Sequence, residues 1–369
     1  MEQPASPKRA LKLTKGATGP AVAEVRDRLT RLGLLSSAEA GSSDIFDEAV
    51  VDAVRTFQQD RGITVDGIVG PLTFRRLEEA RWNLGDRIVS FSPGRINAGD
   101  DVAELQRRLN SLGFDAGRAD GVFGSGTDQA LREFQRNVGV DVDGTCGPDV
   151  WRALERLIRT VSGGAGHQMR QAHQHTVSRT GVADKVIVID PGHGGPDHGT
   201  VGHRLAESII ADDLSKRIEG RLAAIGTQVL VSRPTSYDMS HALDEPARAE
   251  FANDNGADLV VSLHTDSEST GKAHGVATFY YGHANDHSVL GQRFAEIVQH
   301  EIVRSTDLTD GRIHGKTWEL LRLTQMPAVR IECGYVSNQH DADRLADAAF
   351  RDALAQAIAT AVTKYFAPD

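Results

Sequence analysis

The chain has 369 residues, which predicts two or three domains at ~100–200 residues per domain. Its composition, 40% hydrophobic and 25% charged, excludes a wholly disordered or collagen-like chain. The net charge of −10 argues against a generic nucleic-acid binder, and no apolar run approaches the ~20 residues of a membrane-spanning helix. We therefore expect no nucleic-acid partner and no membrane-spanning segment.

Neither the N-terminal residues nor the cysteines fix the compartment in which the protein works. Residues 1–10 show no apolar core and no small-residue cleavage site of a secretory leader. The expected location is the cell wall or extracellular space if the chain is exported, and the cytoplasm is the alternative. Cys146 and Cys333 are too few for a disulfide framework, so we expect two buried thiols.

The first half of the chain repeats itself. Residues 21–33 match residues 101–113, and residues 46–71 match residues 123–148. Each copy predicts three helices. In the first helix, apolar residues recur every three or four positions, and these are Val22, Val25, Leu29 and Leu32 in one copy and Val102, Leu105, Leu109 and Leu112 in the other.

An Asp-Gly turn precedes the third helix of each copy. The turns are Asp66-Gly67 and Asp143-Gly144, and Gly-Pro follows each of them. Proline suits the first turn of a helix, because its missing N–H would have no partner there. Whether the Asp-Gly pairs serve only as turns or contact a ligand is left open, with even weight.

The two copies resemble the three-helix peptidoglycan-binding repeat of bacterial cell-wall enzymes. The resemblance rests on LxxLG followed by FDEAVVDAVRTFQQDRGITVDGIVGPLT, and on FGSGTDQALREFQRNVGVDVDGTCGP. It places the repeats at residues 13–80 and 98–158, and it implies peptidoglycan or muropeptides as partners. Residues 161–184 are rich in Gly, Ser and His and predict a flexible linker. A solvated linker is favoured over a metal site formed by its histidines, which are His167, His173 and His175.

From Lys185 onward, short apolar runs alternate with longer amphipathic segments. The strand-like runs are 186–189, 229–231, 259–263, 276–280 and 328–331. The helical segments lie near 207–225, 245–255, 286–304 and 341–366. This alternation predicts an α/β domain with a largely parallel sheet.

Polar residues cluster where these strands end. His193 follows the first strand, His264 follows the third, Glu332 follows the last, and Glu207 opens a helix. Active sites of such sheets lie at the carboxyl ends of the strands. Two histidines and two glutamates there suit a catalytic zinc, which takes three protein ligands and water and needs a further carboxylate to move a proton.

The motifs DPGHGG, a glutamate opening the next helix, SLH and PAVRIECGYVSN, in this order, resemble the zinc-dependent N-acetylmuramoyl-L-alanine amidases of the type-3 class. The resemblance covers residues 185–366. It implies that His193, Glu207 and His264 bind Zn²⁺ and that Glu332 is the catalytic carboxylate; no other cofactor is implied. The expected architecture is two three-helix all-α repeats followed by an α/β zinc amidase domain, a layout that resembles actinobacterial repeat-repeat-amidase proteins.

Two departures from the family pattern concern the last strand. Arg330 places a charge where an apolar residue is usual, so we expect it to have an ion-pair partner or a polar face. Glu-Cys-Gly-Tyr replaces the commoner E-x-G-F. Arg233 and Arg248 also lie in family-like segments, and we expect both to form structural salt bridges.

The expected activity is cleavage of the amide between N-acetylmuramic acid and L-alanine of the stem peptide. A cytoplasmic, non-enzymatic, amidase-like regulator of cell-wall precursor synthesis, acting through a protein partner, is the alternative. A different zinc hydrolase is disfavoured because the chain has no HExxH motif.

Overall fold

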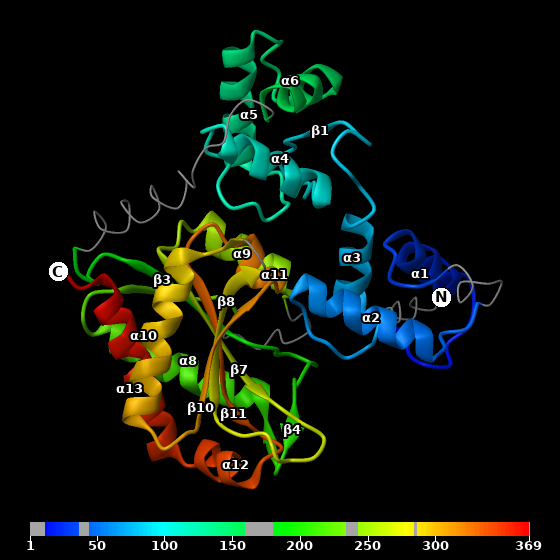
Figure 1. The fold of residues 1–369 in the computed structure, drawn as a ribbon. Helices are drawn as coiled ribbons and strands as arrows, with labels where there is room; N and C mark the ends of the chain where they lie inside the picture. Colours follow the sequence, from blue (N-terminus) through cyan, green and yellow to red (C-terminus); the bar gives the residue numbers. More distant parts are fainter. Residues whose placement is uncertain (1–11, 37–43, 159–179, 234–242, 284–285, 369) are drawn as a thin grey trace, which may run out of the picture. The chain divides into compact units, whose positions relative to one another are not determined.

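The computed structural model describes residues 12–36, 44–158, 180–233, 243–283 and 286–368. The chain divides into two compact units, one up to His167 and one from Gln168, and each is described by itself (Figure 1). Most of the predicted linker, with its three histidines, lies outside the described residues. None of the described helices is long and apolar enough to span a bilayer.

The first unit contains the predicted three helices in each repeat. They are α1 (Pro20–Arg31), α2 (Glu48–Arg61) and α3 (Pro71–Glu79), then α4 (Asp100–Ser111), α5 (Ser125–Val138) and α6 (Pro148–Ile158). Helices α3 and α6 begin at the predicted prolines. The recurring apolar residues of α1 and α4 belong to the hydrophobic cores of the first and second repeat. Val22, Leu29, Val102 and Leu109 are fully buried. Short strands β1 (Val89–Ser90) and β2 (Thr145–Cys146) pair antiparallel.

A buried glutamine holds the Asp-Gly turn before each third helix. In the first repeat, Gln58 donates to Asp66 Oδ1 at 2.7 Å and accepts from the Gly67 N–H at 2.8 Å. Gln135 makes the equivalent bonds to Asp143 and Gly144 in the second repeat. Since these groups are satisfied within the fold, the structure favours the turn interpretation over a direct ligand contact.

The second unit is built on a mixed sheet in the order β10-β8-β11-β7-β3-β6. Its strands are β3 (Val186–Pro191), β6 (Gln228–Val231), β7 (Leu259–Asp266), β8 (Val276–His283), β10 (Asp310–Lys316) and β11 (Ala328–Tyr335), with β9 (Asp286–His287) paired to β8. Strands β6, β3, β7 and β11 are mutually parallel, which confirms the largely parallel prediction. Strand β8 runs antiparallel to β11, and β10 runs parallel to β8.

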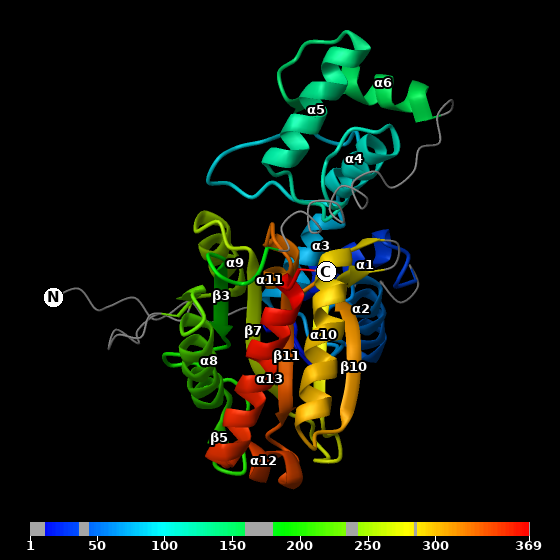
Figure 2. The ribbon, with the colours of Figure 1, turned by 90° about the vertical axis from the view of Figure 1, so that its left-hand side faces the viewer.

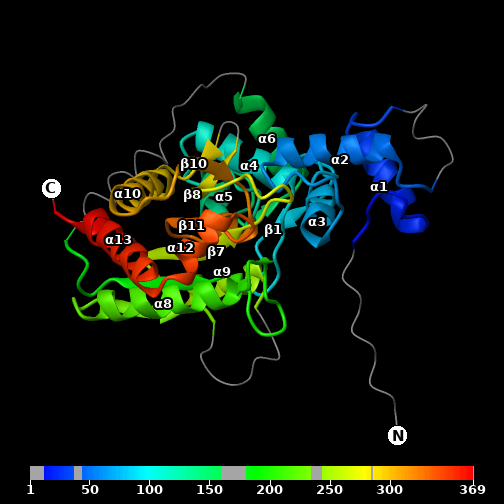
Figure 3. The same ribbon diagram turned by 90° about the horizontal axis from the view of Figure 1, so that it is seen from below.

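Helices cover both faces of this sheet. Helices α8 (Glu207–Ala223), α10 (Val289–Ser305) and α13 (Ala348–Phe366) pack on one face, and α9 (Glu245–Asp254) and α11 (Glu319–Leu323) on the other. Figure 2 shows α10 and α13 side by side along the sheet, and Figure 3 shows α8 beside α13. A short hairpin of β4 (Val201–Gly202) and β5 (Leu205–Ala206) precedes α8, and α12 (Gln339–Ala346) precedes α13.

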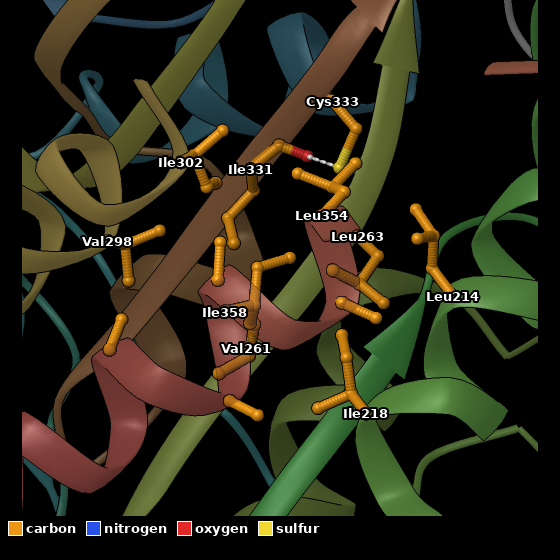
Figure 4. Close-up of a cluster of buried hydrophobic side chains, with 14 of the residues drawn as sticks. Leu214, Ile218, Val261, Leu263, Val298, Ile302, Ile331, Cys333, Leu354 and Ile358 are labelled. Atoms are coloured by element: carbon orange, nitrogen blue, oxygen red, sulfur yellow. Dashed lines mark hydrogen bonds between the residues drawn. The ribbon is translucent and has the colours of Figure 1, made fainter. Parts of the chain in front are cut away.

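Strand alternation decides which side chains enter the main core. Leu263 and Ile331 point into the cluster with α8, α10 and α13 (Figure 4). Their neighbours His264 and Glu332 therefore face the opposite side of the sheet. Cys333 belongs to the same core, and its thiol lies 3.8 Å from the carbonyl oxygen of Ile331. Both cysteines are free and buried, as expected.

Candidate metal centre

Three of the predicted residues converge at the carboxyl edge of the parallel strands. His193 follows β3, Glu207 is the first residue of α8, and His264 lies on β7. The potential ligand atoms of these residues all lie within 4.8 Å of one another. His264 Nδ1 is 2.8 Å and His193 Nε2 is 3.3 Å from the same oxygen, Glu207 Oε1. Two imidazoles thus aim at one carboxylate oxygen.

His193 is held in an uncommon backbone conformation. Its φ of 60° lies in the left-handed region, which costs a non-glycine residue free energy unless its surroundings impose it. Two contacts do so. Asp197 Oδ2 lies 2.7 Å from His193 Nδ1, and Arg233 donates to the His193 carbonyl oxygen at 3.1 Å. Because the bond to Asp197 occupies Nδ1, Nε2 is the nitrogen turned toward Glu207.

Glu207 is buried and fully engaged. Its Oε2 accepts from the Thr200 backbone N–H at 2.8 Å and from the Thr200 hydroxyl at 2.9 Å. Its Oε1 accepts from the Thr265 N–H at 3.2 Å. Burial raises the pKa of this carboxyl, but its bonds to His193 and His264 outweigh burial and hold the pKa far below its usual range. Glu207 is therefore a fixed anion.

His264 is available as a neutral ligand. Burial, with a contribution from the charge of Arg330, lowers its pKa to about 4. A neutral imidazole is the form that binds a metal. Gly192 leaves room for it, since a Cβ there would collide with the His264 ring. Two imidazoles and a carboxylate, without thiolate, form a donor set that fits a catalytic zinc.

Glu332 lies beside this group on the neighbouring strand. It is the register partner of His264 across β11 and β7, so both side chains leave the same face of the sheet. Its Oε1 accepts from Arg330 at 2.7 Å. Its Oε2 is buried and has no hydrogen-bond partner in the described part of the chain. Burial raises the pKa of Glu332 to about 7, despite the lowering effect of Arg330.

Arg330 has the ion-pair partner that the sequence predicted. Besides Glu332, it reaches Glu245 Oε1 on α9 at 3.4 Å. Its guanidinium lies over the Trp318 ring at 4.4 Å from the centroid. Positions 330 and 332 are two apart on one strand, so their side chains share a face and the pair forms within β11.

Arg248 and Arg233 form structural salt bridges, as expected. Arg248 pairs with the fully buried Asp190 at 2.9 Å, directly beneath the metal-site loop. Arg233 pairs with Asp212 at 3.2 Å.

Sequence reasoning missed the residues that orient the ligands. Asp197 and Thr200 fix His193 and Glu207, yet neither was singled out. The available signal was modest: Asp197 lies four residues after His193 in a glycine-rich loop that must double back for the histidine to reach α8. Metal-binding histidines commonly have such a carboxylate partner.

A groove of about 380 Å³ lies along β8 and β10 beside Glu332. It is lined by His274, Ala277, Phe279, His314, Lys316 and Tyr335, among others. Ala277 is the register partner of Glu332 across β8 and β11. The groove therefore opens onto the strand that carries the candidate catalytic carboxylate, at a volume within the range of ligand sites.

Comparisons with protein families match both halves of the chain. The N-acetylmuramoyl-L-alanine amidase family model matches residues 187–364. The peptidoglycan binding domain model matches residues 18–77 and 98–154.

Individual proteins are similar to the whole chain or to its second half. N-acetylmuramoyl-L-alanine amidase CwlM of Mycobacterium tuberculosis is 42% identical over 95% of this chain and 88% of its own length. The germination-specific N-acetylmuramoyl-L-alanine amidase of Bacillus subtilis is 29% identical over 50% of this chain and 81% of its own. Among solved structures, the N-acetylmuramoyl-L-alanine amidase of Clostridium difficile 630 is 32% identical to this chain. The match covers 50% of this chain and 97% of that protein's chain, with a TM-score of 0.46.

Proposed function

The chain belongs to the N-acetylmuramoyl-L-alanine amidase family, and we propose that it hydrolyses the amide between the lactyl group of N-acetylmuramic acid and L-alanine in peptidoglycan. The observation that carries this proposal is the convergence of His193, Glu207 and His264, with Glu332 in register beside them. These are the residue types that metal-assisted amide hydrolysis requires: a ligand set and a separate buried carboxylate.

We propose His193, Glu207 and His264 as the ligands of one zinc ion. When bound, zinc supplies a Lewis acid that polarises the scissile carbonyl and lowers the pKa of water. Asp197 keeps the His193 ring oriented, and the Thr200 bonds keep Glu207 in place. The protein groups thus hold the site in position before substrate binds.

Glu332 is the proposed general base and acid. Its Oε2 accepts a proton from the attacking water as the new C–O bond forms, and it returns that proton to the alanine nitrogen as the C–N bond breaks. The pKa of about 7 suits both roles near neutral pH. Arg330 holds the other oxygen, so Oε2 is the one left for the proton.

The test combines metal analysis with a cleavage assay on the full chain. We expect about one zinc per chain and release of a peptide that begins with L-alanine from a muramoyl peptide. Glu332→Gln should retain the zinc and lose at least ~10²-fold in turnover. Glu250→Gln, at an exposed position on α9, is the matched control and should change neither quantity. Full activity in Glu332→Gln would refute the proposed role.

We further propose that the repeats concentrate the enzyme on peptidoglycan, with functional boundaries at 13–80 and 98–158, a linker at 161–184 and the amidase domain at 185–366. The six helices described in the first unit fall within the two repeat ranges. Two linked weak sites bind a polymer more tightly than either site alone, through effective concentration.

One observation favours the non-enzymatic alternative, a regulator of precursor synthesis. Arg330 forms an ion pair at 2.7 Å with the carboxylate that would act as the base. The cleavage assay separates the two functions. A protein that binds zinc, cleaves no muramoyl peptide and copurifies with a precursor-synthesis enzyme would be a regulator.

A further inference from the structure

One arginine bonds to both of the chain segments that carry His193 and Glu207. Arg233 follows β6, the strand that pairs with β3, and its side chain is 16% exposed. It donates to the His193 carbonyl oxygen at 3.1 Å and to the Ser208 carbonyl oxygen at 3.1 Å. Ser208 directly follows Glu207 in the chain. A single guanidinium therefore contacts the backbone of one candidate ligand and the backbone next to another.

Two neighbours hold this guanidinium in place. Asp212, one turn after Ser208 on α8, pairs with Arg233 at 3.2 Å. Gly194 leaves the space that Arg233 occupies, since a Cβ at Gly194 would collide with the Arg233 side chain. The planar fork of donors on an arginine can serve two carbonyl oxygens and a carboxylate at once. Arg233 is thus fixed to α8 and reaches across to the loop that carries His193.

The backbone ties α8 to the far end of this loop, and Arg233 ties α8 to the near end. The Glu207 N–H donates to the Thr200 carbonyl oxygen at 2.9 Å, and the Ser208 N–H donates to the His198 carbonyl oxygen at 3.2 Å. His193 lies at the start of the loop, with a φ of 60° in the left-handed region. A non-glycine residue keeps this conformation only where its surroundings impose it. The bond from Arg233 to the His193 carbonyl oxygen does so from the α8 side.

We propose that Arg233 is a positioning residue of the metal centre: it joins the start of α8 to the left-handed backbone of His193 and so sets the separation of the His193 and Glu207 side chains. This inference rests on the proposed function, because it takes both residues as ligands of the metal. Ligands that are held in place before the metal arrives lose less conformational freedom when it binds. The affinity for zinc therefore depends on Arg233, although Arg233 acts only through the backbone.

The charge of Arg233 alone would have the opposite effect on zinc binding. A guanidinium near the metal centre repels a bound cation, so loss of the charge by itself should strengthen zinc binding. Loss of the two carbonyl bonds should weaken it. The sign of the change in zinc affinity therefore separates positioning from electrostatics.

The test measures metal binding by the full chain, so it does not depend on catalysis. Arg233→Met keeps most of the side-chain length and removes both carbonyl bonds. We expect its zinc affinity, measured by competition with a chelator, to fall by about 10–100-fold. The visible absorption spectrum of the Co²⁺-loaded chain should also change, because these bands depend on the coordination geometry. Arg233→Lys keeps the charge without the planar fork, and its zinc affinity should lie between those of Arg233→Met and the wild type.

Arg221→Met is the matched control. Arg221 lies on α8 with its side chain 24% exposed, donates to the Arg217 carbonyl oxygen at 2.9 Å and pairs with Asp352 on α13. Its loss should lower the free energy of unfolding without changing the zinc affinity or the Co²⁺ spectrum. An unchanged or higher zinc affinity in Arg233→Met, or an equal loss in Arg221→Met, would overturn the inference. If Arg233→Met does not fold, Arg233→Lys decides, and a wild-type affinity and spectrum in that variant would also overturn it.

Cleavage of the muramoyl peptide scores the proposed function separately. A wild type that binds zinc but cleaves no peptide would refute the hydrolase, while the variants would still score the role of Arg233. Cleavage by a wild type whose zinc affinity is unchanged in Arg233→Met would refute the positioning role alone. A wild type that binds no zinc would overturn both.

Discussion

Arg330→Leu places an apolar side chain on β11 and removes the only cation paired with Glu332 among the described residues. In the wild type, Arg330 contacts Glu332 at 2.7 Å, and the two side chains are 19% and 5% exposed. The substitution leaves Glu332 buried without a counter-charge. We expect this to raise the pKa of Glu332 above its wild-type value of about 7.

The substitution also lowers the free energy of unfolding, by an amount that depends on pH. Removing one partner of a buried ion pair costs about 3–5 kcal/mol, because an uncompensated charge stays buried. The partial exposure of Arg330 places the expected loss near the lower end, about 3 kcal/mol at pH 9. At pH 5, Glu332 is protonated in both proteins, and only about 1 kcal/mol of packing change is expected.

The sign follows from linkage. The pKa of Glu332 is higher in the folded chain than its unfolded value of 4.5. The contribution of this group to stability is therefore fully present below about pH 4.5, and it is lost as the pH rises through the folded pKa near 7. Arg330 limits this loss in the wild type. Without Arg330 the folded pKa is higher, so the stability gap between the two proteins widens above pH 7.

Urea unfolding at pH 5 and pH 9 measures the stability gap, and the pH profile of turnover measures the ionisation of Glu332. The acid limb should lie near pH 7 in the wild type and at higher pH in Arg330→Leu. The double variant Arg330→Leu/Glu332→Gln should recover the stability lost at pH 9. Arg344→Leu, which breaks a half-exposed pair with Asp307, is the control and should show little change at either pH. An unfolding free energy that falls equally at both pH values, with an unmoved acid limb, would refute the reasoning.

Two further predictions concern the ligand loop and the repeats. Asp197→Ala frees the His193 ring and should weaken zinc binding by about 10–100-fold. Competition with a chelator measures this affinity, and an unchanged affinity would show that Asp197 does not orient the ligand. The fragment 12–158 should sediment with purified cell wall, and a fragment that stays wholly in the supernatant would rule out targeting by the repeats.

Local sequence patterns were sufficient for most of the fold. The apolar runs at 186–189, 259–263 and 328–331 became β3, β7 and β11, and helices begin at Pro71 and Pro148 as expected. His264 and Glu332 lie inside their strands, because β7 and β11 continue three to four residues beyond the apolar runs. Strand β10 was missed. Its sequence, DGRIHGK, holds one apolar residue and two glycines, as befits an edge strand with one neighbour.

The candidate site was predictable where it depends on sequence order and unpredictable where it depends on distant contacts. His193, Glu207 and His264 were identified because each follows an apolar run or opens a helix, at the edge where parallel topology brings side chains together. The reversed direction of β8 has no local signature, yet it sets Ala277 level with Glu332 and so brings the groove along β8 and β10 beside the candidate catalytic carboxylate. Which side chains surround Glu332 is therefore a property of the folded sheet, because it depends on the register between strands that are distant in the chain.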